Sequence, residues 1–126
     1  MEIYSGIRHQ PKVIKKEKYN GIEYIISSNG LYPCAYIDVS HTIYSFISTE
    51  NQMLQNFPCH GGITYAWKKY PAQTEEQKDS WFIGWDYAHG DCDYTPYYNS
   101  LGHKWTLEEI TIHCKAAIDY IKRSEI

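Results

Sequence analysis

The chain has 126 residues, enough for one globular domain but too few for two independent hydrophobic cores. Its 12 basic and 15 acidic residues give a net charge of −3, which argues against a general nucleic-acid-binding protein. Hydrophobic residues make up 43% and charged residues 21%, as in ordinary folded chains, and no apolar run approaches the ~20 residues of a membrane span. We therefore expect a single domain over residues 1–126 and no membrane partner.

The N-terminal segment has an excess of positive charge. Residues 1–18 carry five basic and two acidic side chains, a local charge of +3. We predict that residues 1–20 form a solvated basic arm or an edge strand. A more specific alternative is an arm that closes over an anionic ligand. Residues 1–5 lack the basic-then-apolar order of a secretion signal, so we expect a cytoplasmic protein with reduced cysteines.

Two short runs rich in aromatic and β-branched residues predict a β-hairpin. They are residues 23–27 and 32–37, and the tripeptide Ser28-Asn29-Gly30 lies between them. Asn-Gly supplies the positive φ that a tight hairpin turn requires. Pro33 cannot donate a backbone hydrogen bond, so it belongs near the start of a strand or on a sheet edge.

The middle of the chain contains two further candidate strands. Residues 39–58 fit either a short helix or an irregular covering loop. Residues 60–67 predict a strand opened by two glycines, and the polar residues 68–80 predict a surface loop. Residues 81–86 predict a strand that is apolar on both faces and therefore central in its sheet. Residues 86–103 have the composition of a loop.

A C-terminal helix over residues 105–123 has the clearest sequence signals. Thr106 and Glu109 have the spacing of a capping box, and Lys122 and Arg123 suit the carbonyl-rich end of the helix. One stripe of the helix is apolar: Leu107, Ile110, Cys114, Ala117, Ile118 and Ile121. Strands followed by one amphipathic helix predict an α+β domain, in which an antiparallel sheet packs against that helix.

One candidate functional segment covers residues 59–64. It places the imidazole of His60 beside Gly61 and Gly62, where a bare backbone can approach a ligand closely. The thiols of Cys59 and Cys92 lie beside His60 and Asp91 in the sequence, so of the four cysteines these two are the candidates for a chemical role.

The other candidate segment covers residues 85–93. Asp86 and His89 lie three positions apart at the end of a predicted strand, and Asp91 and Cys92 follow them. If the two predicted strands are neighbours, both segments converge at one end of the sheet.

Three interpretations of this convergence stay open. The first is a divalent metal site, although the spacing matches no established motif; its ligands would be His60, Asp86, His89 and Asp91. The second is a metal-free ligand pocket, formed by His60, Gly61, Gly62, Thr64, Trp85, Asp86, His89, Asp91 and, from the arm, Arg8. The third is structural: the acids cap turns, the histidines bond backbone carbonyls and the tryptophans belong to the core.

In the pocket interpretation, each side chain has a role toward a nucleotide. Trp81, Trp85 or Tyr87 would stack on a flat ring, and Asp86 would accept a hydrogen bond from a base edge or a ribose hydroxyl. His60 and His89 would donate hydrogen bonds, and Arg8 or Lys12 would cover phosphates. The chain contains no nucleophilic-serine elbow, phosphate-binding loop or dinucleotide-binding glycine pattern.

The two segments resemble a widespread family of small phage and prophage proteins. His60-Gly-Gly-Ile-Thr-Tyr65 is similar to the family pattern H-G-G-[LI]-T-[FY]. Trp81-Phe-Ile-Gly-Trp-Asp-Tyr-Ala-His-Gly-Asp91 is similar to W-[WF]-x-G-[FW]-D-x-A-H-x-G-D. The resemblance covers most of residues 22–122, and Tyr87 stands where the family has a cysteine. Small accessory phage proteins often antagonise bacterial immunity, so the resemblance implies an anti-defence role.

We therefore expect a phage-type counter-defence protein that binds and sequesters a nucleotide-derived immune signal without turnover, in the cytoplasm of an infected bacterium. Two alternatives stay open: a metal-dependent hydrolase, and a protein that inhibits a host defence nuclease by direct contact. We expect no cofactor. A domain of this size is expected to build its pocket at a homo-oligomer interface.

Overall fold

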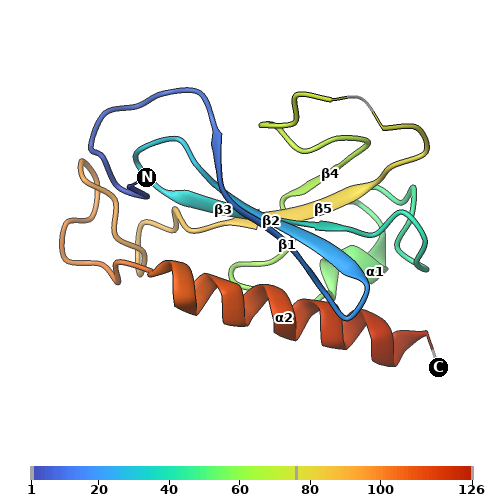
Figure 1. Ribbon diagram of the computed structural model, residues 1–126. Helices are drawn as coiled ribbons and strands as arrows, with labels where there is room; N and C mark the ends of the chain where they lie inside the picture. The colour runs from blue at the N-terminus through green and yellow to red at the C-terminus, as the bar shows by residue number, and fades with distance from the viewer. Residues whose placement is uncertain (1, 76, 126) are drawn as a thin grey trace.

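The computed structural model describes residues 2–75 and 77–125, which form a five-stranded antiparallel sheet and two helices (Figure 1). The strand order is β1-β2-β3-β5-β4. The elements are β1 (Lys12–Tyr19), β2 (Ile22–Ser28), β3 (Pro33–Asp38), α1 (Gln52–Gln55), β4 (Tyr65–Trp67), β5 (Phe82–Asp86) and α2 (Leu107–Ser124). The predicted α+β class, an antiparallel sheet against a C-terminal helix, is confirmed.

The predicted hairpin is present as β2 and β3, but its connection is longer than a two-residue turn. Ser28 pairs with Pro33, and the Asn29 side chain accepts the backbone N–H groups of Leu31 and Tyr32 at 3.0 and 3.1 Å. Only Gly30 of this Asn-Gly pair takes a positive φ, +91°. The asparagine therefore acts as a side-chain cap of the turn.

A two-residue Asn-Gly turn does occur, between β1 and β2. Tyr19 pairs with Ile22, and both central residues, Asn20 and Gly21, have positive φ (51° and 80°). This is the turn geometry that matches the twist of a hairpin. Strand β1 lies at one edge of the sheet, so an edge strand, one of the two forms predicted for residues 1–20, is present over Lys12–Tyr19.

Strand β5 lies between β3 and β4, as predicted for a strand that is apolar on both faces. Its Ile83 and Trp85 belong to the main core, while Phe82 joins a smaller cluster on the opposite face. Strand β4 begins only at Tyr65, later than the predicted strand over 60–67. Positive φ angles at the two preceding glycines, 72° and 85°, turn the chain out of the sheet.

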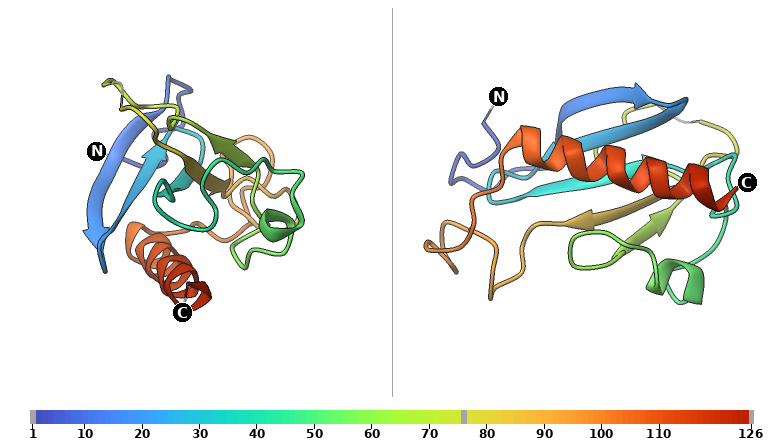
Figure 2. Two further views of the ribbon diagram at one scale, coloured as in Figure 1. Left: turned by 90° about the vertical axis from the view of Figure 1, so that its right-hand side faces the viewer. Right: turned by 90° about the horizontal axis from the view of Figure 1, so that it is seen from below.

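Helix α2 lies along one face of the sheet, with α1 beside it (Figure 2). The capping box of Thr106 and Glu109 is confirmed, with both reciprocal hydrogen bonds present. Residues 39–58 form turns and the single helical turn α1. Leu54 of α1 is fully buried, and the Phe57 ring meets the Tyr120 ring of α2 at 5.2 Å.

Among the described residues, no helix combines the length and apolar character needed to cross a membrane.

Candidate functional site

The carboxylate of Asp93 is fully buried where the two candidate segments meet. His60 Nε2 lies 2.9 Å from both of its oxygens, and His89 Nδ1 lies 2.8 Å from Oδ2. Trp105 Nε1 donates to Oδ1 at 2.8 Å, and the backbone N–H of His89 donates to Oδ2 at 2.9 Å. An ionised carboxylate only accepts hydrogen bonds, so both imidazoles must donate to it. One acid therefore orients two histidines.

These contacts determine the charge state of Asp93. Burial alone would raise its pKa, but hydrogen bonds from His60, from the backbone and ring of His89, and from Trp105 hold the pKa well below its usual range. Asp93 is therefore ionised at neutral pH.

The chain forms this site by a tight turn and a short bridge. The backbone N–H groups of Cys92 and Asp93 both donate to the carbonyl of His89, at 3.1 and 2.8 Å. This turn brings the Asp93 carboxylate back to the His89 ring. The backbone of His103 then bonds Cys92 at 2.8 Å and Tyr94 at 2.9 Å, which places the following residues, Trp105 among them, against the turn.

An aromatic stack connects the site to the core and to α2. The rings of His60 and Tyr87 are parallel within 8°, with centroids 4.7 Å apart. The Tyr87 hydroxyl accepts from Trp85 Nε1 at 2.9 Å and shares a hydrogen bond with His113 Nδ1 at 2.8 Å. Burial, and then the electrostatic effect of the neighbouring His60, lower the pKa of His113, so the neutral form of His113 is favoured.

The two glycines of the first segment have structural roles that differ from the predicted one. A Cβ on Gly61 would lie 2.1 Å from His89 Nε2, so the imidazole occupies the space that only glycine leaves free. The backbone N–H of Gly62 donates to the Cys59 carbonyl at 3.2 Å. The Gly62 amide, part of the backbone predicted to approach a ligand, is therefore already engaged within the protein.

The structure brings His60 and His89 together, with ring centroids 5.1 Å apart, but not the two predicted acids. Asp86 accepts from the backbone of Ala88 at 3.1 Å and from Thr64 Oγ1 at 3.4 Å, so it caps the turn after β5. Asp91 is exposed on the outside of the next turn. Within the described residues, neither acid hydrogen-bonds to a histidine of the site, and the predicted four-residue metal set does not form.

Trp85 does not have the predicted role of a stacking surface. Its side chain is 1% exposed within the main core, so no face of the indole is open to a ligand. Thr64 and Asp86 lie at the sheet end and contact each other rather than the histidines.

Asp93, Trp105 and His113 are the site residues that sequence reasoning missed. The four-residue spacing from His89 to Asp93 was the available signal for the acid, because a single turn can return one side chain to the other. The positions of Trp105 and His113 depend on how α2 docks, which no local pattern reports.

Arg8 lies at a separate feature, an open cavity of about 370 Å³. Four segments form its walls: the N-terminal arm, the β2–β3 turn, the turn after β5 and the loop of residues 95–98. Ala88 and Gly90 line it on either side of His89 in the sequence. The cavity and the histidine cluster therefore share this turn.

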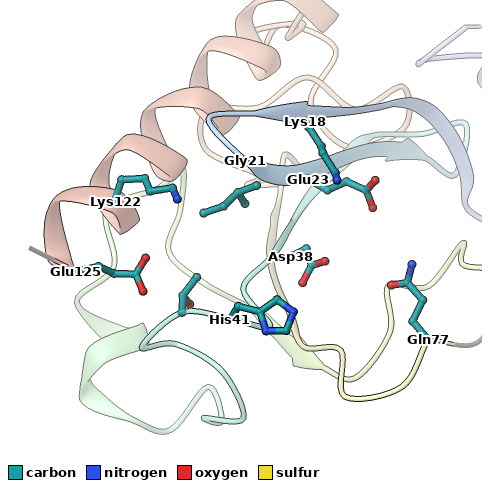
Figure 3. Close-up of a pocket in the computed structure, with 10 residues that line it drawn as sticks. Lys18, Gly21, Glu23, Asp38, His41, Gln77, Lys122 and Glu125 are labelled. Carbon is teal, nitrogen blue, oxygen red and sulfur yellow. The ribbon is translucent and has the colours of Figure 1, made fainter.

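A polar cavity of about 380 Å³ lies at the end of the sheet near the C-terminus of α2 (Figure 3). Two lysines, three carboxylates and one imidazole surround it: Lys18, Lys122, Glu23, Asp38, Glu125 and His41. No predicted site residue lines this cavity, and its mixed charge favours neither an anion nor a cation.

Comparison of this chain with protein-family models, with curated proteins and with solved structures finds no match. The resemblance to small phage proteins accordingly stays a prediction based on the two segments.

Proposed function

We propose that this protein binds and holds a flat, phosphate-bearing molecule of the nucleotide class in the Arg8 cavity. The observation that carries the proposal is the combination of tyrosine rings and one guanidinium around a single open cavity. The cavity volume of about 370 Å³ falls in the range of small-molecule sites.

The aromatic part of the cavity suits a nucleobase. Tyr32, Tyr97 and Tyr98 all line it, and Tyr97 and Tyr98 are 68% and 86% exposed. Exposed rings offer free π-faces, and stacking of a base on such a face contributes about 1–3 kcal/mol. Large exposed aromatic groups at a cavity are typical of binding sites.

The polar part of the cavity suits phosphate or ribose. The Arg8 guanidinium is exposed and forms the planar pair of donors that phosphate oxygens accept. Thr95 also lines the cavity, and it is 6% exposed. Its Oγ1 has no hydrogen-bond partner among the described residues but is itself covered, so the exposed Arg8 guanidinium supplies the main polar contact.

The walls of the cavity are connected to one another before any ligand binds. Backbone hydrogen bonds join Gly6 to Gly30 at 3.0 Å and His9 to Asn29 at 2.8 Å. The Tyr97 hydroxyl donates to the Gly6 carbonyl. Arg8 thus lies between two residues, Gly6 and His9, that are hydrogen-bonded to other walls of the cavity. A segment that is already ordered loses less conformational entropy when a ligand binds.

The chemistry of the lining supports retention of the ligand rather than its conversion. The lining residues contribute no carboxylate, thiol or imidazole that could act as a nucleophile or general base. In the setting that the phage resemblance implies, tight binding alone would withdraw a nucleotide signal from its receptor.

A thermal-shift screen against cyclic dinucleotides and ADP-ribose derivatives, followed by calorimetry, tests the proposal. A ligand that binds the folded state raises the melting temperature. Loss of the charged hydrogen bonds in Arg8→Gln is expected to weaken binding about 10- to 100-fold, whereas Lys12→Gln, a change in the same basic region outside the cavity, leaves it unchanged.

The ligand recovered after heating the complex is expected to be intact. Recovery of a cleaved product would support the hydrolase alternative and overturn the proposed retention. If no compound in the screen binds, or if Arg8→Gln binds as tightly as the wild type, the cavity is not a nucleotide site. Capture of a host nuclease in place of any small ligand would favour the protein-inhibitor alternative.

A further inference from the structure

We propose that His60, Cys92 and Asp93 form a binding site for a divalent cation of the zinc class. One potential ligand atom from each of these residues lies within 4.8 Å of the other two. The site is distinct from the Arg8 cavity, and it uses two residues, Cys92 and Asp93, that the predicted metal set did not contain.

The spacing of the three donors suits a tetrahedral ion. Cys92 Sγ lies 3.5 Å from Asp93 Oδ1, and His60 Nε2 lies 2.9 Å from the same oxygen. Ligands at zinc–ligand distances of about 2.0–2.3 Å in tetrahedral geometry are about 3.3–3.6 Å apart. The sulfur–oxygen pair already has this separation, and the nitrogen–oxygen pair must open by about 0.4 Å.

The site has the outer hydrogen bonds that a metal-binding carboxylate requires. Trp105 Nε1 holds Oδ1 at 2.8 Å, while the ring and backbone of His89 hold Oδ2 at 2.8 and 2.9 Å. The hydrogen bonds from Trp105 and His89 remain possible when the direct contact between His60 and Asp93 opens to admit an ion. Such partners orient a ligand and commonly contribute 10- to 100-fold to metal affinity.

The donor types determine which ion fits. Imidazole nitrogen and thiolate sulfur favour zinc, cobalt and related ions, whereas magnesium and calcium require mainly oxygen ligands. On binding, the ion takes the place of the proton between His60 Nε2 and Asp93, and this proton moves to Nδ1. The Cys92 thiol releases its proton to solvent and binds as thiolate. Three protein ligands leave a fourth position for water.

The ion can reach the site from solvent. Cys92 is exposed and the His60 side chain is 16% exposed, although Asp93 is fully buried beneath them. Cys59, the neighbour of His60, provides a matched control because its half-buried thiol lies outside the donor group.

Titration of the metal-free protein with Co²⁺, in the absence of any nucleotide, tests the site. We expect one ion per chain, with tetrahedral visible bands and a thiolate charge-transfer band in the near ultraviolet, and displacement by Zn²⁺. Cys92→Ser is expected to remove the charge-transfer band and to weaken binding by more than about tenfold, whereas Cys59→Ser retains both.

Because Cys92 is exposed, its replacement leaves the fold intact, which the melting temperature of the variant without metal verifies. Absence of Co²⁺ and Zn²⁺ uptake at micromolar concentrations would overturn the proposal. Equal uptake by Cys92→Ser and wild type would also overturn it. Neither result bears on nucleotide binding, since the titration contains no nucleotide.

Discussion

Replacement of Asp93 by asparagine tests whether this carboxylate holds the site together. The change keeps the size of the side chain but removes its charge and places an N–H₂ group among donors. His60, His89 and Trp105 then compete for one remaining acceptor oxygen. A hydrogen bond to a charged group contributes about 1.5–3 kcal/mol, and removal of one partner from a buried ionic cluster costs about 3–5 kcal/mol.

Because the donors share one carboxylate, their contributions do not add, and we expect Asp93→Asn to lower the unfolding free energy by about 3–5 kcal/mol in metal-free protein. Urea unfolding at pH 7, followed by tryptophan fluorescence, measures this loss. Asp91→Asn is the matched control, since it removes an exposed carboxylate two positions away. Similar unfolding midpoints for the two variants would refute the anchoring role of Asp93.

The stability difference between wild type and Asp93→Asn is also expected to depend on pH. The pKa of Asp93 is lower in the folded state than in the unfolded state, so its stabilising contribution is present above the unfolded value of about 3.9. This contribution disappears as the pH falls through the lower folded value. The stability difference between wild type and Asp93→Asn is therefore expected to shrink progressively below about pH 4. A difference that stays constant at lower pH would contradict the ionic argument.

Two further predictions concern the surroundings of the site. Gly61→Ala is expected to lower the unfolding free energy, measured in urea, by at least about 1 kcal/mol more than Gly62→Ala. Both glycines have positive φ, but only a Cβ at Gly61 would meet the His89 ring. Equal losses of unfolding free energy in the two variants would exclude this packing argument. His113 has a lowered pKa in the folded state, so the unfolded chain takes up a proton more readily as the pH falls below about 6.5. The groups that face His113 are Tyr87, His60 and Glu109. The melting temperature should therefore fall more steeply from about pH 7 to pH 5 in wild type than in His113→Gln. Parallel curves of melting temperature against pH would contradict this prediction.

Elements with local signals could be predicted from the sequence. The α2 start follows from Thr106 and Glu109, whose reciprocal hydrogen bonds involve residues only three positions apart. The Asn20-Gly21 turn carried an equally local signal, but the prediction considered only the second Asn-Gly pair. There the asparagine caps the turn with its side chain, and the N-terminal arm packs against Gly30, a long-range contact that no local pattern reports.

The site could be predicted only in part. His60 and His89 could be placed together because His60 precedes β4, His89 follows β5, and these two strands are antiparallel neighbours. The identity of their acid could not be predicted, since three aspartates, Asp86, Asp91 and Asp93, lie within eight positions and all are equally polar. Their burial depends on the turn after β5 and on its backbone contacts to residue 103, which are non-local.

The buried acid and the open cavity are mechanically linked through one turn. Asp93 holds both the ring and the backbone N–H of His89, and the residues on either side, Ala88 and Gly90, line the Arg8 cavity. Because a backbone hydrogen bond fixes the path of the turn, the shape of one cavity wall depends on the Asp93 carboxylate. Gly61 supports the same turn from the opposite side by leaving room for the His89 ring. In the proposed function, Asp93 and His89 therefore act through the backbone of this turn, although neither His60 nor His89 lines the cavity.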